Sequence, residues 1–102
     1  MSIRWTRTAT IANGKYMEAI GWAKEVSGYA QKTYGTTVTV WLDAFGPVGT
    51  IRWQSDFTDL QALDKVQNQM MADGTYWQLI DKAFKSGLFI DGTSNDVVSL
   101  QV

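Results

Sequence analysis

The chain has 102 residues, a length that suits one domain with one hydrophobic core. Its nine basic and ten acidic residues give a net charge of −1, and no basic run or stripe indicates a nucleic-acid-binding surface. The sequence contains no cysteine and no histidine, which excludes disulfides, thiolate nucleophiles and histidine ligands to zinc or haem. We therefore expect neither a metal nor a cofactor.

No apolar stretch approaches the ~20 residues that span a bilayer, and the first residues lack a signal-peptide pattern. The sequence thus favours a cytoplasmic protein without a membrane span. Five Trp, four Tyr and four Phe are many for this length. Because large aromatic side chains dominate cores and interfaces, we expect a binding surface or a dimer face besides the core.

The first half of the chain predicts a strand followed by a helix. Apolar and polar residues alternate from Ile3 to Ile11, except that Arg7 falls on the apolar side. Asn13 is a candidate helix cap. Helical spacing of apolar residues then runs from Lys15 to Tyr34, and Gly35 follows at the position of a C-terminal glycine cap.

A hairpin is predicted next, because alternating runs from Thr36 to Phe45 and from Thr50 to Phe57 flank a glycine- and proline-containing turn. Thr58 then begins a capping-box sequence, Thr-Asp-Leu-Gln, which predicts Thr58 as the cap of a second helix. Asp73 and Gly74 interrupt this helix, and Asp73 or Thr75 can cap its second segment.

The chain then predicts a loop that ends at Asp96 and a last strand from Val97 to Val102. The order of elements is strand, helix, strand, strand, helix, strand. It predicts one α+β domain over residues 1–102, with the ferredoxin-like β-α-β-β-α-β order. The expected sheet has four antiparallel strands with the helices on one face.

The other face of such a sheet is left without a helix layer. We expect it to carry Arg4, Thr6, Thr8, Thr39, Trp41, Arg52 and Gln54, with Val98, Leu100 or their neighbours. This open face could stay solvated. Mainly because of Trp41 and the apolar last strand, we expect it instead to meet the same face of a second copy in a homodimer. Arg4 and Arg52 could pair with Asp43 and Asp56 on it.

Two segments resemble a known superfamily. The run Gly-Thr-Ile-Arg-Trp-Gln-Ser-Asp-Phe-Thr-Asp-Leu at 49–60 resembles the hairpin strand and helix start of dimeric α+β barrel proteins. The run Met-Met-Ala-Asp-Gly-Thr-Tyr-Trp-Gln-Leu at 70–79 resembles the Asp-x-x-Tyr break in their long second helix. The branch it resembles most is the NIPSNAP-like one. The resemblance covers residues 49–102 in sequence and residues 1–48 by element order alone.

That resemblance implies a dimeric α+β barrel whose ligand lies between the sheet and the helices. The superfamily includes cofactor-free monooxygenases, haem proteins, lactone isomerases and many proteins of unknown role. Because this chain has no histidine, it lacks the ligand that the haem-binding members use. The motifs are structural and do not specify a reaction.

Arg7 is the most informative candidate for a binding site, because a charge on the helix-facing side of a sheet needs a partner or water. It could meet a carboxylate, an enolate or another oxyanion of a ligand. Alternatively, it could extend to the sheet edge or pair with Glu18 or Glu25. Ser55 could donate a hydrogen bond to a ligand or only to a backbone carbonyl. The aromatic residues that could line a flat pocket, or simply fill the core, are Trp5, Trp53, Trp22, Tyr16 and Trp77.

Three hypotheses follow for the function. The first is a homodimeric protein that binds a small apolar or aromatic molecule between sheet and helices. The second is an enzyme like the cofactor-free monooxygenases, in which Arg7 stabilises an oxyanion. The third is a non-catalytic structural or partner-binding dimer with a filled core. A cavity beside Arg7 would favour the first two, and a tightly packed interior would favour the third.

Overall fold

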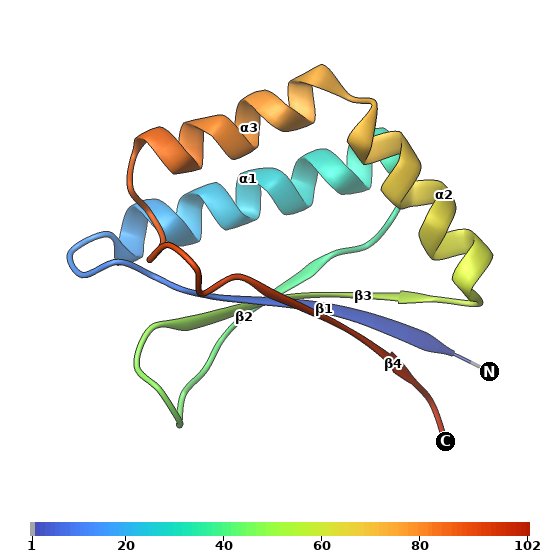
Figure 1. Ribbon diagram of the computed structural model, residues 1–102, viewed down its shortest axis with the longest axis horizontal. Helices are drawn as coiled ribbons and strands as arrows, with labels where there is room; N and C mark the ends of the chain where they lie inside the picture. The colour runs from blue at the N-terminus through green and yellow to red at the C-terminus, as the bar shows by residue number, and fades with distance from the viewer. Residues whose placement is uncertain (1) are drawn as a thin grey trace.

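The computed structural model describes residues 2–102, which form a four-stranded antiparallel sheet with three helices on one of its faces (Figure 1). The elements in chain order are β1 (Ile3–Thr10), α1 (Tyr16–Tyr34), β2 (Thr39–Leu42), β3 (Thr50–Phe57), α2 (Leu60–Met71), α3 (Gly74–Lys85) and β4 (Asn95–Leu100). The strands lie in the order β2-β3-β1-β4. The α+β, ferredoxin-like prediction is confirmed, with the second helix divided into α2 and α3.

β1 lies in the middle of the sheet, and its register decides which side chains face the helices. Arg7 is opposite Trp53 of β3 on one side and Asp96 of β4 on the other. Trp5 is likewise opposite Ser55 and Val98. Because directly opposed residues in antiparallel strands point to the same face, these side chains form one helix-facing group.

The packed core lies at the end of the sheet where β1 leads into α1. Ile11 and Ile51 are the largest fully buried side chains, and Ala19 and Ala23 of α1 are completely covered. Small residues on α1 let the helix approach the sheet closely there. Ile11 also pairs with Phe89 in an isolated bridge, which ties the segment after α3 to the end of β1.

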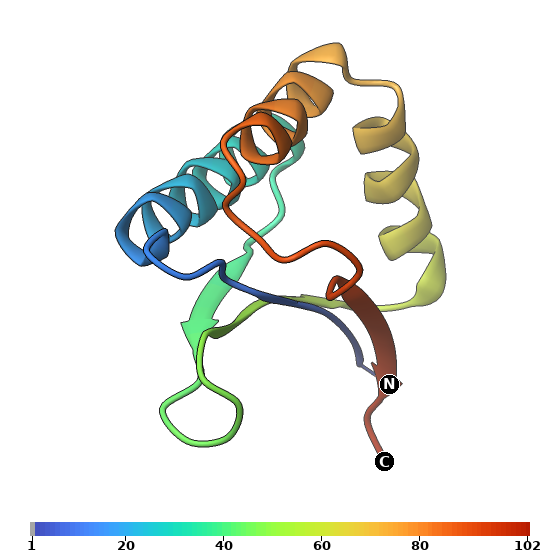
Figure 2. The ribbon, with the colours of Figure 1, turned by 60° about the vertical axis from the view of Figure 1, so that its left-hand side comes forward.

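The three helices do not cover the sheet equally. α1 and α3 lie side by side, whereas α2 stands apart from them at an angle (Figures 1 and 2). No residue of α2 is buried. α2 therefore stands at the border of the helix layer and contributes little to the packed core.

The last strand differs from its sequence prediction. β4 begins at Asn95, so Asp96 belongs to the strand and not to the loop before it. Val98 and Leu100 pair with Trp5 and Ile3, which places them on the helix side of the sheet. Val97, opposite Thr6, is the apolar residue that this strand contributes to the open face.

Two predicted helix caps are wrong. Asp59, and not Thr58, caps α2, because its carboxylate accepts a hydrogen bond of 2.8 Å from the backbone N–H of Ala62. Thr58 still belongs to the bend that connects β3 to α2. Asn13 does not cap α1, whose N-cap position is occupied by Lys15 without a side-chain hydrogen bond.

The remaining predicted boundaries mostly hold. Gly35 ends α1 in a left-handed conformation, with φ of 68°. Asp73 caps α3 through a 3.0 Å hydrogen bond from the N–H of Thr75. β2 is shorter than predicted at both ends. Before it, the carbonyls of Thr37 and Val38 accept hydrogen bonds from the side chains of Ser55 and Ser27.

Arg4 and Arg52 do pair with Asp56 and Asp43 on the open face, and each pair is bidentate. Arg4 donates to Asp56 at 2.9 and 3.2 Å, and Arg52 donates to Asp43 at 2.8 and 2.9 Å. No helix of residues 2–102 combines the length and the apolar character that a membrane crossing requires.

Gly49 shows how tightly the hairpin is joined to α1. Its φ is +86°, and a Cβ atom at this position would lie 2.5 Å from the hydroxyl oxygen of Tyr16. The Gly49 carbonyl also accepts a 2.9 Å hydrogen bond from the N–H of Ile11. Tyr16 therefore packs against the hairpin end.

We expect Gly49→Ala to lower the free energy of unfolding by about 2 kcal/mol or more, because a left-handed backbone is strained with any Cβ atom and the added methyl also contacts Tyr16. Urea denaturation of the purified variant measures the loss. Gly14→Ala is the matched control, since Gly14 has φ of +78° with nothing within 4 Å of the added atom. An equal loss in both variants would mean that the Tyr16 contact does not matter.

Candidate functional site

A cavity of about 230 Å³ lies between the helix-facing side of the sheet and the three helices. Trp5, Trp53, Val38 and Phe57 line it from the sheet side. The helices contribute a mainly apolar set of lining residues: Trp22, Val26 and Ala30 from α1, Leu63, Val66 and Met70 from α2, and Tyr76 and Ile80 from α3. The interior beside Arg7 is therefore not completely filled, which is the condition that favours the two ligand-based hypotheses.

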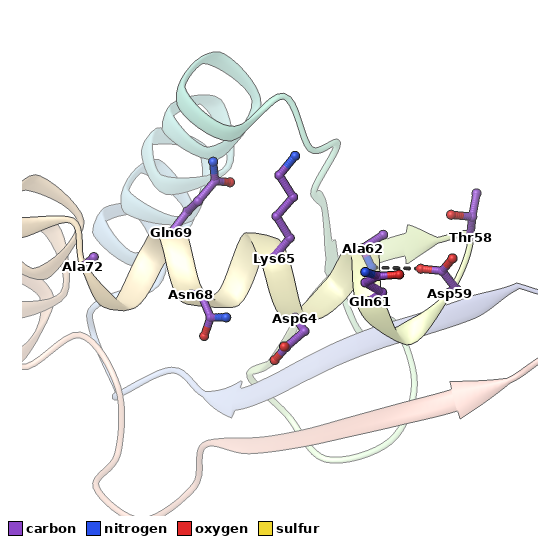
Figure 3. Close-up of a pocket in the computed structure, with 9 residues that line it drawn as sticks. All are labelled: Thr58, Asp59, Gln61, Ala62, Asp64, Lys65, Asn68, Gln69 and Ala72. Atoms are coloured by element: carbon purple, nitrogen blue, oxygen red, sulfur yellow. Dashed lines mark hydrogen bonds between the residues drawn. The ribbon is translucent and has the colours of Figure 1, made fainter.

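A larger hollow of about 840 Å³ runs along the outer side of α2 (Figure 3). It is lined only by α2 and the turns at its two ends, and most of its side chains are polar. Lys65 and Gln69 point to one side of the helix, and Asp64 and Asn68 point to the other (Figure 3). Because nothing closes over it, we interpret this hollow as a solvated helix face and not as the site.

The aromatic wall of the cavity is fixed in place by edge-to-face contacts. The ring of Trp22 lies 6.1 Å from that of Trp53 and 5.5 Å from that of Phe89, with interplanar angles of 87° and 65°. Trp53 and Phe89 are 5.8 Å apart. The indole N–H of Trp22 donates to the carbonyl of Leu79 at 2.8 Å. Such contacts hold the rings in one arrangement, so the wall is preformed.

Arg7 lies at the polar end of the cavity and is paired with Asp96. Its Nε and Nη2 atoms donate to the two carboxylate oxygens of Asp96 at 2.6 and 2.9 Å. The indole N–H of Trp5 also donates to Asp96, at 3.2 Å, and the Arg7 guanidinium lies 5.4 Å from the centre of the Trp5 ring. The partner of Arg7 is thus Asp96, and neither Glu18 nor Glu25.

The electrostatics of this pair favour its ionised form. Partial burial alone would raise the pKa of Asp96, but the hydrogen bonds and charge of Arg7, with the Trp5 N–H, outweigh burial and lower it. The hydrogen bond to Asp96 is the main reason that the pKa of Arg7 is raised. Both groups therefore stay charged at neutral pH, and their charges cancel at the cavity.

Tyr76 is a cavity residue that the sequence analysis did not single out. The residue is 7% exposed and lines the cavity beside Arg7. The hydroxyl lies close enough to the guanidinium that Tyr76 is among the groups that raise the pKa of Arg7. The Asp-x-x-Tyr sequence was the signal that could have identified it.

Ser55 lines the cavity but is already satisfied. Its hydroxyl donates to the carbonyl of Thr37 at 2.8 Å, so the Thr36 hydroxyl, 3.1 Å away, is left to donate to Ser55. This is the backbone-carbonyl alternative of the two given for Ser55. The residue joins β3 to the segment after α1.

Five of the seven candidate residues line the cavity, and Tyr16 and Trp77 do not. Tyr16 packs against Gly49 at the hairpin. Trp77 is 44% exposed, donates to the carbonyl of Met71 at 3.0 Å and packs edge-to-face on Tyr76. It therefore supports the cavity wall from outside.

Hydrogen bonds at the break between α2 and α3 fix the position of the cavity wall that α2 forms. The carboxylate of Asp73 accepts hydrogen bonds from the hydroxyls of Tyr29 and Tyr34, at 2.5 and 2.6 Å, while it also caps α3. The two phenol groups lower the pKa of Asp73. Burial, with the nearby carboxylate, raises the pKa of Tyr34. This cluster ties the break to the C-terminal end of α1.

Comparison with known proteins supports the fold and gives no function. No family model and no curated protein matches the chain. Among solved structures, a NIPSNAP family protein from Agrobacterium tumefaciens aligns with a TM-score of 0.79 at 18% identity, over 100% of this chain and 94% of that one. An uncharacterised NIPSNAP-like domain protein from Burkholderia xenovorans aligns with a TM-score of 0.81 at 12% identity, over 99% and 85%.

A protein described as an antibiotic biosynthesis monooxygenase also aligns, with a TM-score of 0.69 at 13% identity and 98% coverage of both chains. Identities this low establish a shared fold alone. The expected likeness in fold to NIPSNAP-like proteins of the ferredoxin-like α+β class is therefore confirmed.

We expect the stabilising effect of Asp73 to depend on pH. Its pKa is depressed in the folded state, so between the folded value and the ordinary value of about 3.9 the unfolded chain binds more protons. The contribution is complete above the ordinary value and is lost as the pH falls through the folded value. The difference in urea midpoint between the wild type and Asp73→Asn should thus be larger at pH 7 than near pH 3. Asp64→Asn, on the solvated side of α2, is the control; a pH-independent difference for Asp73→Asn would contradict the prediction.

Proposed function

We propose that the protein binds a small apolar or aromatic molecule in the cavity between the sheet and the helices, and that it does so as a homodimer. The observation that carries the proposal is an aromatic-walled cavity with one polar end. Small-molecule sites are typically concave and mainly apolar, with a few placed polar groups. Of the residues that line this cavity, Trp5, Trp22 and Trp53 supply large flat surfaces, and Arg7 supplies hydrogen-bond donors.

The packing around the cavity favours binding over a purely structural role. Protein interiors contain few voids larger than a water molecule, and the core next to the cavity, around Ile11 and Ile51, is closely packed. The same chain thus fills one end of the helix–sheet interface and leaves the other open. A filled core, which the structural-dimer hypothesis requires, does not describe the end that contains Arg7.

A cofactor-free monooxygenase is the second candidate, because the fold is shared with a protein of that description. Such chemistry would use Arg7 to stabilise an oxyanion, and Asp96 already neutralises that charge. Binding without catalysis is therefore the function that we favour. Oxygen uptake in the presence of a bound aromatic compound would favour the enzyme instead.

The open face of the sheet is the surface that we propose for the homodimer. Trp41, 56% exposed, and Val97 lie on it, and Thr39 accepts the 2.9 Å hydrogen bond of the Trp41 indole. A two-fold contact uses the same patch on both copies. Trp41 lies on β2, at one edge of the sheet, and an exposed Trp is a typical anchor of an interface.

Titration with naphthalene, followed by the indole N–H signals in a ¹⁵N–¹H spectrum, tests binding. Three of the five Trp residues line the cavity, and Trp41 and Trp77 do not. We expect the signals of the lining Trp residues to shift and those of the other two to stay in place. Ala30→Leu should abolish the shifts, because Ala30 lines the cavity and the added carbons fill it.

Ala23→Leu is the matched control for that variant. Ala23 is on the same helix but lies in the packed core with no exposure, so overpacking there should cost about 1–3 kcal/mol of stability. Ala30→Leu should change stability far less. If Ala30→Leu is as destabilising as Ala23→Leu, or if naphthalene shifts no lining Trp, the cavity does not bind ligands as proposed.

We expect Trp41→Glu to convert the dimer into a monomer, because the change removes a large apolar contact and places a charge that loses its hydration in the interface. Sedimentation velocity of the wild type and the variant at micromolar concentration measures the change in mass. Phe84→Glu, which alters an exposed aromatic residue of α3, should leave the dimer intact. A monomeric wild type would show that the dimer part of the proposal is wrong.

A further inference from the structure

We propose that the cavity selects neutral molecules that carry a hydrogen-bond acceptor, such as aryl ketones, and discriminates against the corresponding carboxylates. This inference rests on the proposed binding function and specifies the chemical class of the ligand. It follows from the charges, the free donors and the size of the same cavity.

Charge is the first argument. Of the residues that line the cavity, all within the described part of the chain, Arg7 and Asp96 are the charged ones. They are joined by two hydrogen bonds of 2.6 and 2.9 Å, and Trp5 adds a third to Asp96. The lining therefore has no net charge. A carboxylate would lose its hydration and would meet the carboxylate of Asp96 beside the guanidinium, which costs free energy.

The hydrogen-bond inventory is the second argument. A guanidinium has five N–H donors, and Asp96 uses those of Nε and one from Nη2. Asp96 does not use the Nη1 donors or the second Nη2 donor, and the Tyr76 hydroxyl lies beside the guanidinium. Among the buried side-chain nitrogen and oxygen atoms of residues 2–102, the indole nitrogen of Trp53, a residue that lines the cavity, has no hydrogen-bond partner. Buried polar groups are ordinarily hydrogen-bonded, so the Trp53 indole N–H calls for an acceptor. The spare donors of Arg7, whose side chain is 34% exposed, can bind the same kind of group.

The other small polar groups of the lining are already in use. Ser27 donates to the carbonyl of Val38, Ser55 donates to that of Thr37, and the Thr36 hydroxyl is bonded to Ser55. The hydrogen-bonding capacity that remains in the lining thus belongs to Arg7, Tyr76, the Trp53 indole N–H and the Gln67 amide. A ligand with one acceptor at one end matches this arrangement.

Size is the third argument. The volume of about 230 Å³ lies below the roughly 300–1,000 Å³ that is typical of drug-sized ligands. The edge-to-face Trp22 and Trp53 rings present flat surfaces on one side. A molecule with one aromatic ring or two fused rings fits between these walls. In an aryl ketone of this size, the carbonyl group would reach the donors of Arg7 and Tyr76.

A matched series of three ligands tests the inference on the wild-type protein. Methyl naphthyl ketone, isopropenylnaphthalene and naphthoate have the same ring and nearly the same shape, and differ in the end that would meet Arg7 and Tyr76. Calorimetric titration should give an affinity for the ketone about fivefold above that for the hydrocarbon, which corresponds to the usual net contribution of a hydrogen bond. Naphthoate should bind more weakly than the ketone by at least as much.

Asp96→Asn should reverse the preference between ketone and carboxylate. Asparagine keeps the size of the side chain but removes its charge, which leaves Arg7 with an uncompensated positive charge in the cavity. Naphthoate should then bind more tightly than the ketone. Asp56→Asn breaks the corresponding pair with Arg4 on the open face and should leave the wild-type order unchanged.

Tyr76→Phe is a second test, and it leaves the charges of Arg7 and Asp96 unchanged. It should lower the affinity for the ketone several-fold and leave the affinity for isopropenylnaphthalene unchanged.

Each outcome separates this inference from the proposed function. Equal or tighter binding of naphthoate to the wild type, or equal binding of ketone and hydrocarbon, would show that the inference is wrong while ligand binding stands. If none of the three compounds binds, the proposed function fails as well. The wild-type series decides the matter even if a variant does not fold.

Discussion

The antiparallel register of β1 between β3 and β4 is the constraint on which the rest of the structure depends. It brings Arg7 between Trp53 and Asp96, on the side of the sheet that faces the helices. A shift by one residue would turn every β1 side chain to the other face. Arg7 would then lie on the open face, and the cavity would lose its polar end. The aromatic wall and the ion pair are therefore consequences of one register.

The helix layer forms the other side of the cavity. α1 and α3 pack together over the core, whereas α2 contributes side chains to the cavity without burying any of its residues. The carboxylate of Asp73 fixes the α2–α3 break to α1 through Tyr29 and Tyr34. An element with little buried apolar surface has low local stability. α2 is thus the part of the cavity wall that can open at the lowest free-energy cost.

The pairing of Arg7 with Asp96 also bears on which activity the fold supports. A site that stabilises an oxyanion needs donors whose charge is not already cancelled. Here the charge is cancelled and the free donors remain, which suits recognition of a neutral acceptor better than stabilisation of a developing anion. The likeness to NIPSNAP family proteins and to a monooxygenase concerns the fold. The chemistry has to be argued from these side chains.

Local sequence patterns determined the order of the elements, because apolar residues repeat with the period of the strand or helix that contains them. The alternation around Arg7 also placed that residue on the helix-facing side, and the helical spacing up to Tyr34 identified the first helix. They did not determine contacts between distant segments. Asp96 is 89 positions from Arg7, and only the β1–β4 register pairs them. The cavity likewise exists because α2 stands away from the sheet, while Tyr16 lies at the hairpin and Trp77 outside. Such placements depend on tertiary packing, which no local pattern encodes.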